Sequence, residues 1–146
     1  MGEFVKLEAS RVDKVAIIRL DRPKVNALNT QVGLELLEVA TEIEGRSDIR
    51  AVVVWGGPRF FAAGADISEF GEARNDAAAA AAYEALNGAA FAAIRGARRP
   101  VIAMIQGYCI GGGLAIALAC DLRIADDTAS FALPPARLGL AYPQDG

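Results

Sequence analysis

The chain has 146 residues, 53% of them hydrophobic, which is enough to bury a sizeable core within one domain. Its net charge of −3 and its pI near 5.0 argue against a nucleic-acid-binding surface. The sequence has no histidine, which excludes Ser-His-Asp and Cys-His mechanisms and the usual zinc ligand sets. Any acid–base catalyst must therefore be a carboxylate, Tyr, Lys, Cys or water.

The cysteines and the hydropathy of the sequence argue against further kinds of site and against a membrane segment. Cys109 and Cys120 form no CxxC pair, so we expect two buried core residues and neither a metal site nor a redox centre. The longest uninterrupted apolar runs, such as residues 114–120, are too short to cross a bilayer. The first residues lack the continuous apolar core of a signal peptide. We expect a soluble cytoplasmic protein that binds neither nucleic acid nor a membrane.

The first half of the chain predicts two strands, a helix and a third strand. Apolar and polar residues alternate over residues 4–8, and residues 15–20 form a second, more buried strand. From Val32 to a stop at Gly45, apolar positions recur at helical spacing. A β-branched run at residues 49–55 predicts a buried strand, so the order favours a β-α-β unit. The other faces of the helix carry Glu35, Glu38 and Glu42.

The second half predicts a helix, a strand and a short helix. Asp76 can cap a helix that begins with six alanines at residues 77–82 and ends near Gly96. Residues 101–105 form a buried strand, and residues 114–119 form a short helix that we expect to be buried on every side. Further strands are expected at 121–125 and 131–133, and a turn or helix at 136–139.

A glycine-rich segment, residues 106–114, joins that strand to the short helix. Glycines at such a junction let a ligand approach the main chain, and the first N–H groups of a helix have no intrahelical acceptor. The junction therefore suits an anion or a developing oxyanion. Small residues also gather at residues 62–66, after the strand at 49–55, where open α/β folds commonly bind ligands.

Three segments, in this order, resemble the enoyl-CoA hydratase/isomerase (crotonase) family. They are Arg-Pro and Asn-Ala-Leu-Asn within residues 22–29, Ala-Gly-Ala-Asp-Ile at 63–67, and the glycine-rich segment continued through residues 107–125. The resemblance implies an α/β fold, the crotonase-like (ClpP/crotonase) β-β-α superhelix. Since family members are longer, it also implies that residues 1–146 are the N-terminal part of a single, truncated acyl-CoA-binding domain.

The resemblance implies an acyl-CoA thioester substrate, with coenzyme A as part of the substrate and no separate cofactor or metal. The backbone N–H groups of Ala65 and Gly112 would hold the thioester carbonyl oxygen and stabilise the enolate. A homotrimer or a dimer of trimers is also implied. The implied substrate-binding positions are Val25, Ala27, Leu28, Ala63, Asp66 and Ile67.

The sequence departs from the family at the positions of the two hydratase glutamates. They fall on Ala115 and Pro135, and neither residue can transfer a proton. Tyr142 has the spacing of a tyrosine in methylmalonyl-CoA decarboxylase-like members, and Asp145 is near, but not in register with, an isomerase aspartate. The structural alternatives are an aromatic that packs in a core or interface and a turn residue. Isomerisation or decarboxylation is favoured over efficient hydration.

Several alternatives stay open. A non-catalytic acyl-CoA-binding or assembly subunit could keep the thioester site without the glutamates. Asp66 and Asp121 could brace the ends of helices and strands. Arg98 and Arg99 could contact CoA phosphates, but a solvated pair at a helix end is the simpler expectation.

Overall fold

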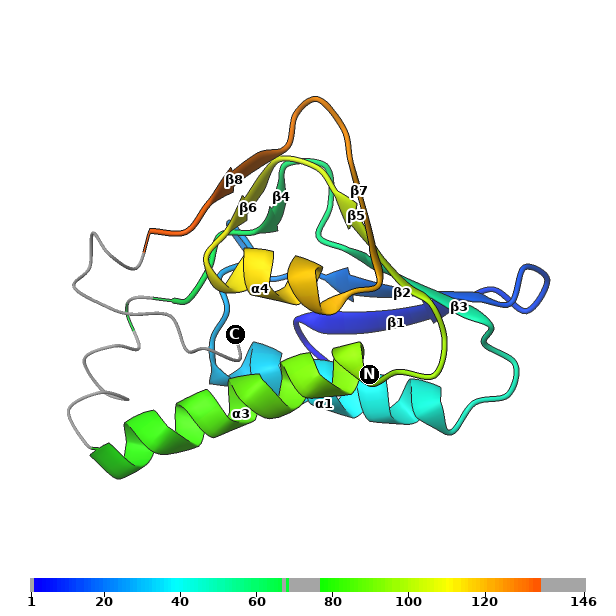
Figure 1. Cartoon of the computed structure of the whole chain (residues 1–146), viewed down its shortest axis with the longest axis horizontal. Coiled ribbons are helices and arrows are strands. Elements are labelled where there is room, and N and C mark those ends of the chain that lie inside the picture. The colour runs from blue at the N-terminus through cyan, green and yellow to red at the C-terminus, as the bar shows by residue number, and fades with distance from the viewer. Residues whose placement is uncertain (1, 67, 69–76, 135–146) are drawn as a thin grey trace.

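The computed structural model describes residues 2–66, 68 and 77–134, which form two β-sheets and the helices packed on them (Figure 1). The larger sheet has the strand order β1-β2-β3-β5-β7, and the smaller has the order β4-β6-β8. The strands of the larger sheet are β1 (Val5–Ala9), β2 (Val15–Leu20), β3 (Ala51–Trp55), β5 (Val101–Ile105) and β7 (Leu122–Ala125). The other elements are β4 (Phe60–Ala62), β6 (Tyr108–Ile110), β8 (Ser130–Ala132), α1 (Thr30–Glu44), α3 (Ala77–Arg95) and α4 (Gly112–Ala119).

The chain winds as a spiral that adds one strand to each sheet at every turn. It runs from β3 to β4 and α3, then from β5 to β6 and α4, and then to β7 and β8. Within each sheet the added strands are parallel to one another. The predicted α/β class and the β-β-α superhelix are therefore confirmed.

Most predicted elements are confirmed within one or two residues, but two strands were missed. β4 and β6 have three residues each, which is too short to show a period-2 pattern, and their pairing with each other is non-local. β6 lies inside the segment that the sequence identified only by its glycines. The expectation that the short helix is buried on every side is wrong, because Leu118 is 54% exposed. The proposed cap Asp76 and the segment 136–139 lie outside the described residues.

The core lies between the sheets and the helices. Asn29 caps the N-terminus of α1, since its side chain accepts a hydrogen bond from the Val32 N–H at 2.9 Å, and the helix buries an apolar stripe that includes Leu36. Both cysteines are buried and free, as predicted. Burial raises the pKa of Cys109 and of Cys120 to about 12, so both remain neutral thiols.

Helix α3 is long and apolar enough to cross a membrane, judged by its length and composition alone. The uninterrupted apolar runs of the sequence did not reveal this property, because Glu84 and Asn87 interrupt the helix. Core helices of globular proteins pass the same test. α3 packs against α1 and α4 and buries Ala90 and Ile94, but only 17% of its apolar window is buried.

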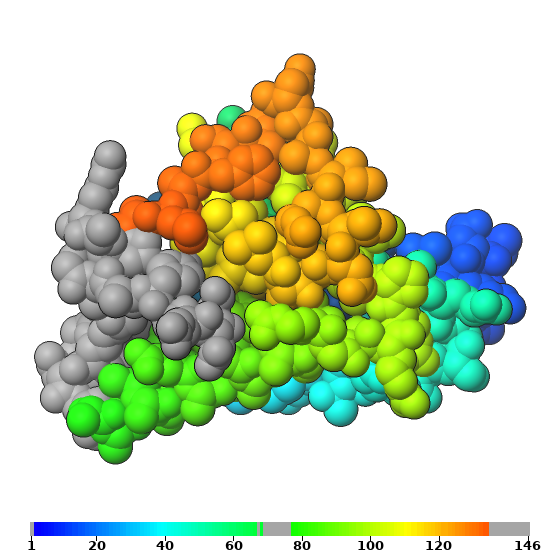
Figure 2. Space-filling model, in the orientation of Figure 1, coloured from blue at the N-terminus to red at the C-terminus, as the bar shows by residue number. Residues whose placement is uncertain are grey.

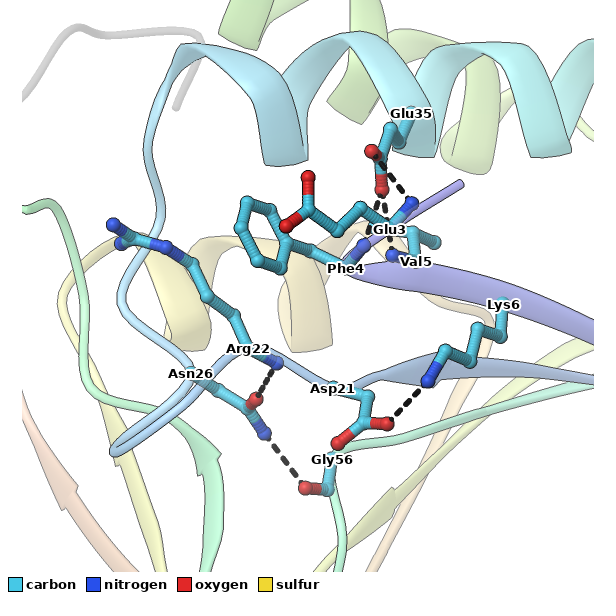
Figure 3. A network of polar contacts seen from close by, with 9 residues as sticks. All are labelled: Glu3, Phe4, Val5, Lys6, Asp21, Arg22, Asn26, Glu35 and Gly56. Carbon is cyan, nitrogen blue, oxygen red and sulfur yellow. Dashed lines mark hydrogen bonds and ion pairs between the residues drawn. The ribbon is translucent and has the colours of Figure 1, made fainter. Parts of the chain in front are cut away.

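A buried carboxylate on α1 ties the first strand to the helix (Figure 3). Glu35 is only 7% exposed, and its oxygens accept the backbone N–H groups of Glu3, Phe4 and Val5 at 2.9, 2.7 and 2.7 Å. Burial raises the pKa of Glu35, but hydrogen bonds from Gln31 and from these backbone groups outweigh it, and the net pKa lies below its usual value. The expectation of an outward-facing Glu35 is therefore wrong.

Replacing Glu35 with glutamine should lower the free energy of unfolding by about 1–3 kcal/mol at neutral pH, because an amide N–H₂ would face backbone donors. The pKa of Glu35 in the folded state lies below 4.5, so the carboxylate contributes its full stabilisation above pH 4.5. That stabilisation is lost as the pH falls through the pKa of the folded state. Urea unfolding of both proteins should therefore show curves that converge in acid. Glu38→Gln, at an exposed position of the same helix, is the matched control; an equal loss in both variants would contradict this role.

Candidate functional site

Two of the predicted site segments lie side by side. The Ala63 N–H donates to the Val25 carbonyl at 3.1 Å, and the Leu28 N–H donates to the Gly64 carbonyl at 2.8 Å. Leu28 and Ala65 form a parallel bridge, which is closed by a 2.8 Å hydrogen bond from the Asp66 N–H to the Leu28 carbonyl. The structure thus brings the loop before α1 against the segment after β4. Of the predicted substrate-binding positions, Ile67 lies outside the described residues.

The bridge determines the direction of the Ala65 backbone. In a parallel pair, the backbone groups of successive residues point to opposite sides of the strand. Leu28 therefore bonds to the Gly64 carbonyl and the Asp66 N–H, and the N–H of Ala65 between them points away from the loop. Gly112 is the first residue of α4, where helical N–H groups have no intrahelical acceptor. Within the described part of the chain, neither the Ala65 N–H nor the Gly112 N–H donates a hydrogen bond.

Parallel pairing of β4 with β6 brings these two donors together. A Cβ atom on Gly112 would lie 4.0 Å from the Ala65 nitrogen and 2.9 Å from Cδ1 of Leu28. A Cβ atom on Gly113 would lie only 2.5 Å from the Ala62 carbonyl oxygen. Glycine at 113 therefore lets α4 approach β4, and glycine at 112 leaves room for the Leu28 side chain next to the start of α4.

Asn26 fixes the loop that carries Leu28 (Figure 3). It is buried, and its backbone φ of 53° is one that asparagine tolerates better than most residues. Its Nδ2 donates to the carbonyls of Gly56, Phe60 and Phe61 at 2.6, 3.0 and 3.3 Å, and its Oδ1 accepts the Arg22 N–H at 2.8 Å. The sequence identified Asn26 only as part of a motif, because the three carbonyls that accept its Nδ2 hydrogen bonds are far away in the chain.

An ion pair between Arg22 and Asp66 also joins the two segments. Nη1 of Arg22 lies 2.9 Å from Oδ2 of Asp66 and donates to the Ala27 carbonyl at 3.0 Å. Hydrogen bonds from Ser68, followed by the contribution of Arg22, hold the pKa of Asp66 below its usual range. The Asp66 carboxylate is thus ionised at neutral pH and engaged by protein groups, which favours the bracing alternative for its side chain.

The residue at the first hydratase position is buried and carries no group that could transfer a proton. Ala115 lies on α4, is 6% exposed, and donates its N–H to the Gly111 carbonyl at 3.0 Å. The second hydratase position, Pro135, and the candidates Tyr142 and Asp145 lie outside the described residues. In residues 2–66, 68 and 77–134 no cluster of His, Cys, Asp or Glu side chains could hold a metal ion.

The two arginines considered for CoA phosphates have structural partners instead. Both lie before β5, whereas the two N–H donors follow β4 and β6. Nε of Arg98 donates to Glu44 at 3.0 Å, and Nε of Arg99 donates to the Ile49 carbonyl at 2.9 Å. Asp121 likewise braces two strands, since its carboxylate accepts the Val101 N–H at 2.8 Å. The structural alternatives are favoured for all three residues.

Comparisons with known proteins identify the family to which this chain is similar. A family model described as enoyl-CoA hydratase/isomerase matches residues 10–146. The chain is 42% identical over 131 residues to "Probable enoyl-CoA hydratase echA8" of Mycobacterium bovis, covering 89% of this chain and 49% of that protein. It is 40% identical over 129 residues to "Short-chain-enoyl-CoA hydratase" of Clostridium acetobutylicum, covering 87% and 49%. The chain spans about half the length of these curated relatives.

Solved structures are similar to this chain in fold as well as in sequence. The Pseudomonas aeruginosa protein DspI superimposes with a TM-score of 0.87 at 40% identity, over 94% of this chain and 55% of that one. An enoyl-CoA hydratase/carnithine racemase from Magnetospirillum magneticum gives a TM-score of 0.91 at 33% identity, over 98% and 54%. Sequence and structure agree over nearly the whole chain. The chain therefore belongs to the enoyl-CoA hydratase/isomerase family.

Proposed function

We propose that this chain provides the thioester-binding part of an acyl-CoA enzyme that stabilises an enolate. The observation that carries the proposal is the pair of backbone donors, Ala65 and Gly112, which lie close together without an acceptor in the described residues. When a base removes the proton next to a thioester carbonyl, the electron pair of the C–H bond moves onto the carbonyl oxygen. Two preorganised N–H donors stabilise that charge, and loss of one such donor typically costs about 3–4 kcal/mol in the transition state.

The substrate class follows from the family and from the position of the donors. We propose an acyl-CoA thioester bound along Val25, Ala27, Leu28, Ala63 and the following residues Asp66 and Ile67. Coenzyme A is then part of the substrate, and the reaction needs neither a metal nor a further cofactor. A cytoplasmic homotrimer or dimer of trimers is part of the same proposal.

Isomerisation or decarboxylation is proposed in preference to efficient hydration. The methyl group of the buried Ala115 cannot activate water, and proline occupies the second glutamate position in the sequence. Tyr142 and Asp145 are the proposed proton-transfer candidates. The alternative, a non-catalytic acyl-CoA-binding subunit, is supported by the same lack of a proton-transferring side chain at Ala115.

NMR of the products separates these possibilities. We expect the active assembly to convert 3-enoyl-CoA or methylmalonyl-CoA faster than it hydrates 2-enoyl-CoA, because it lacks both hydratase glutamates at the matching positions. Efficient hydration of 2-enoyl-CoA would contradict the proposed preference. Tight acyl-CoA binding with no turnover of any of the three would support the non-catalytic alternative.

A further inference from the structure

Helix α3 lies along the surface of the molecule and buries few of its residues. Figure 2 shows α3, coloured green, as a band across the lower part of this face. Most of its residues are alanines, and only Ala90 and Ile94 are buried. Tyr83 is partly buried on this helix, and its hydroxyl donates to the Leu28 carbonyl at 3.4 Å. A side chain of α3 thus reaches the loop that forms part of the proposed thioester site.

Leu28 connects this hydroxyl to both proposed donors. Its N–H donates to the Gly64 carbonyl and its carbonyl accepts the Asp66 N–H, each at 2.8 Å. This parallel bridge sets the direction of the Ala65 N–H, which lies between the two bonded residues. Cδ1 of Leu28 lies 2.9 Å from the position that a Cβ atom on Gly112 would take. A shift of Leu28 would therefore reach both donor positions.

Tyr83 adds a second donor to a carbonyl that already has one. A carbonyl oxygen has two lone pairs, so the Leu28 oxygen can accept both the Tyr83 hydroxyl and the Asp66 N–H. Leu28 is only 6% exposed, and in such surroundings a hydrogen bond restrains its partners more strongly than it would in water. The Tyr83 hydroxyl thus links α3 to the segment that carries Ala65.

A cavity beside Leu28 leaves this residue room to move. The cavity lies between α1, α3 and α4, and Leu28 and Phe91 are among the residues that line it. Its volume of about 10 Å³ is close to the space that one water molecule needs. In a fully packed core the neighbouring atoms would hold the side chain in place. A polar restraint on the backbone therefore matters more at Leu28 than at a residue packed on every side.

We infer that Tyr83 is a positioning residue for the proposed donor pair. Its hydroxyl holds the Leu28 carbonyl, and the bridge from Leu28 then holds the Ala65 N–H toward the thioester oxygen. Tyr83 acts through Leu28 and transfers no proton in this role. The inference rests on the proposed function, because it requires that the Ala65 N–H binds that oxygen.

Amide hydrogen exchange, followed by NMR in the full chain, tests the restraint. Tyr83→Phe removes one oxygen atom and keeps the ring. We expect the amide protons of Leu28 and Asp66 to exchange about fivefold faster in this variant, since the loss of one hydrogen bond makes local opening easier. The amide of Val39, in the middle of α1, should keep its rate. Unchanged rates at Leu28 and Asp66 would overturn the inference, and so would an equal acceleration at Val39, which would indicate a general loss of stability.

Tyr108→Phe is the matched control for the exchange experiment. It removes the same atom from a tyrosine on β6 that is 50% exposed, and it should leave the exchange rates of Leu28 and Asp66 unchanged. An acceleration as large as that of Tyr83→Phe would show that the effect does not come from the contact with Leu28, and the assigned role would then be wrong.

The thioester carbonyl reports whether the restraint reaches the donors. In the active assembly, a bound saturated acyl-CoA labelled with ¹³C at this carbonyl should show a smaller downfield shift with Tyr83→Phe. The kcat should fall about fivefold while KM changes little, because the restraint acts on the stabilisation of the enolate. If the unmodified assembly shifts the resonance and Tyr83→Phe leaves that shift unchanged, the positioning role alone is wrong. If the unmodified assembly shows no shift, the proposed function is wrong as well.

Discussion

Replacing Gly112 with proline, in a chain that also carries Leu28→Ala, should reduce acyl-CoA turnover by about 10²–10³-fold. Proline is tolerated at the first position of a helix, so α4 should persist while one donor of the proposed pair is lost. Leu28→Ala is included because any side chain at 112 would meet Cδ1 of Leu28, 2.9 Å from the Cβ position. Steady-state kinetics of the active assembly would measure the effect.

The matched control is Gly112→Ala in the same Leu28→Ala background. Alanine adds the Cβ atom but keeps the N–H, so the two double variants differ mainly in the donor. The alanine variant should retain most of the kcat of Leu28→Ala alone. Equal kcat values for the proline and alanine variants, with both folded, would show that the Gly112 N–H takes no part in the reaction.

Replacing Asn26 with aspartate should lower the free energy of unfolding by about 3 kcal/mol or more at neutral pH. The new carboxylate would face the carbonyls of Gly56 and Phe60, which now accept hydrogen bonds from Nδ2 at 2.6 and 3.0 Å. A buried anion beside acceptors has a raised pKa, so the defect should shrink as the pH falls and the group becomes neutral. Urea unfolding over a series of pH values would check both parts.

Asn87→Asp is the control for that experiment. It makes the same change of atoms at a partly exposed position on α3 whose side chain has no hydrogen bond in the described residues. It should lower the free energy of unfolding by clearly less than Asn26→Asp does, because it faces no set of carbonyl acceptors, although Asn87 lines an apolar pocket with Val32 and Phe91. A loss as large as that of Asn26→Asp would mean that the three carbonyl contacts of Asn26 do not stabilise the loop.

The longer elements could be predicted from the sequence. α1 shows helical spacing over four turns, and β3 and β5 are short apolar runs bounded by turn residues. β4 and β6 could not, because three residues carry little pattern and their stability comes from pairing across the chain. The small sheet is therefore the part of the fold that sequence patterns missed.

The roles of the buried polar residues Glu35 and Asn26 could not be predicted from the sequence either. Glu35 looks like an exposed residue in a helical pattern, and only the three N–H groups of the first strand explain its burial. Asn26 looks like a turn residue, and only the carbonyls around β4 explain its orientation. Such roles depend on partners that lie about thirty residues away in the chain.

The sequence itself predicted a glycine-rich junction suited to an anion, because glycines mark places where the backbone itself can act, and the family resemblance singled out Gly112 within it. Gly112 begins a helix after a strand, and this is where unpaired N–H groups are expected. The position of Ala65 beside it depends on the bridge to Leu28 and on the pairing of β4 with β6. The sequence suggested Ala65 only through the family resemblance, and geometry explains why its N–H faces away from the loop.

The most direct test of the donor pair uses a saturated acyl-CoA labelled with ¹³C at the thioester carbonyl, so that binding is observed without reaction. We predict that binding shifts the carbonyl ¹³C resonance downfield, because two N–H donors polarise the bond. The shift should persist with Gly112→Ala in the Leu28→Ala background and should shrink with Gly112→Pro. A bound carbonyl with the resonance of free acyl-CoA, or with the same shift in both variants, would contradict the proposed role of Ala65 and Gly112.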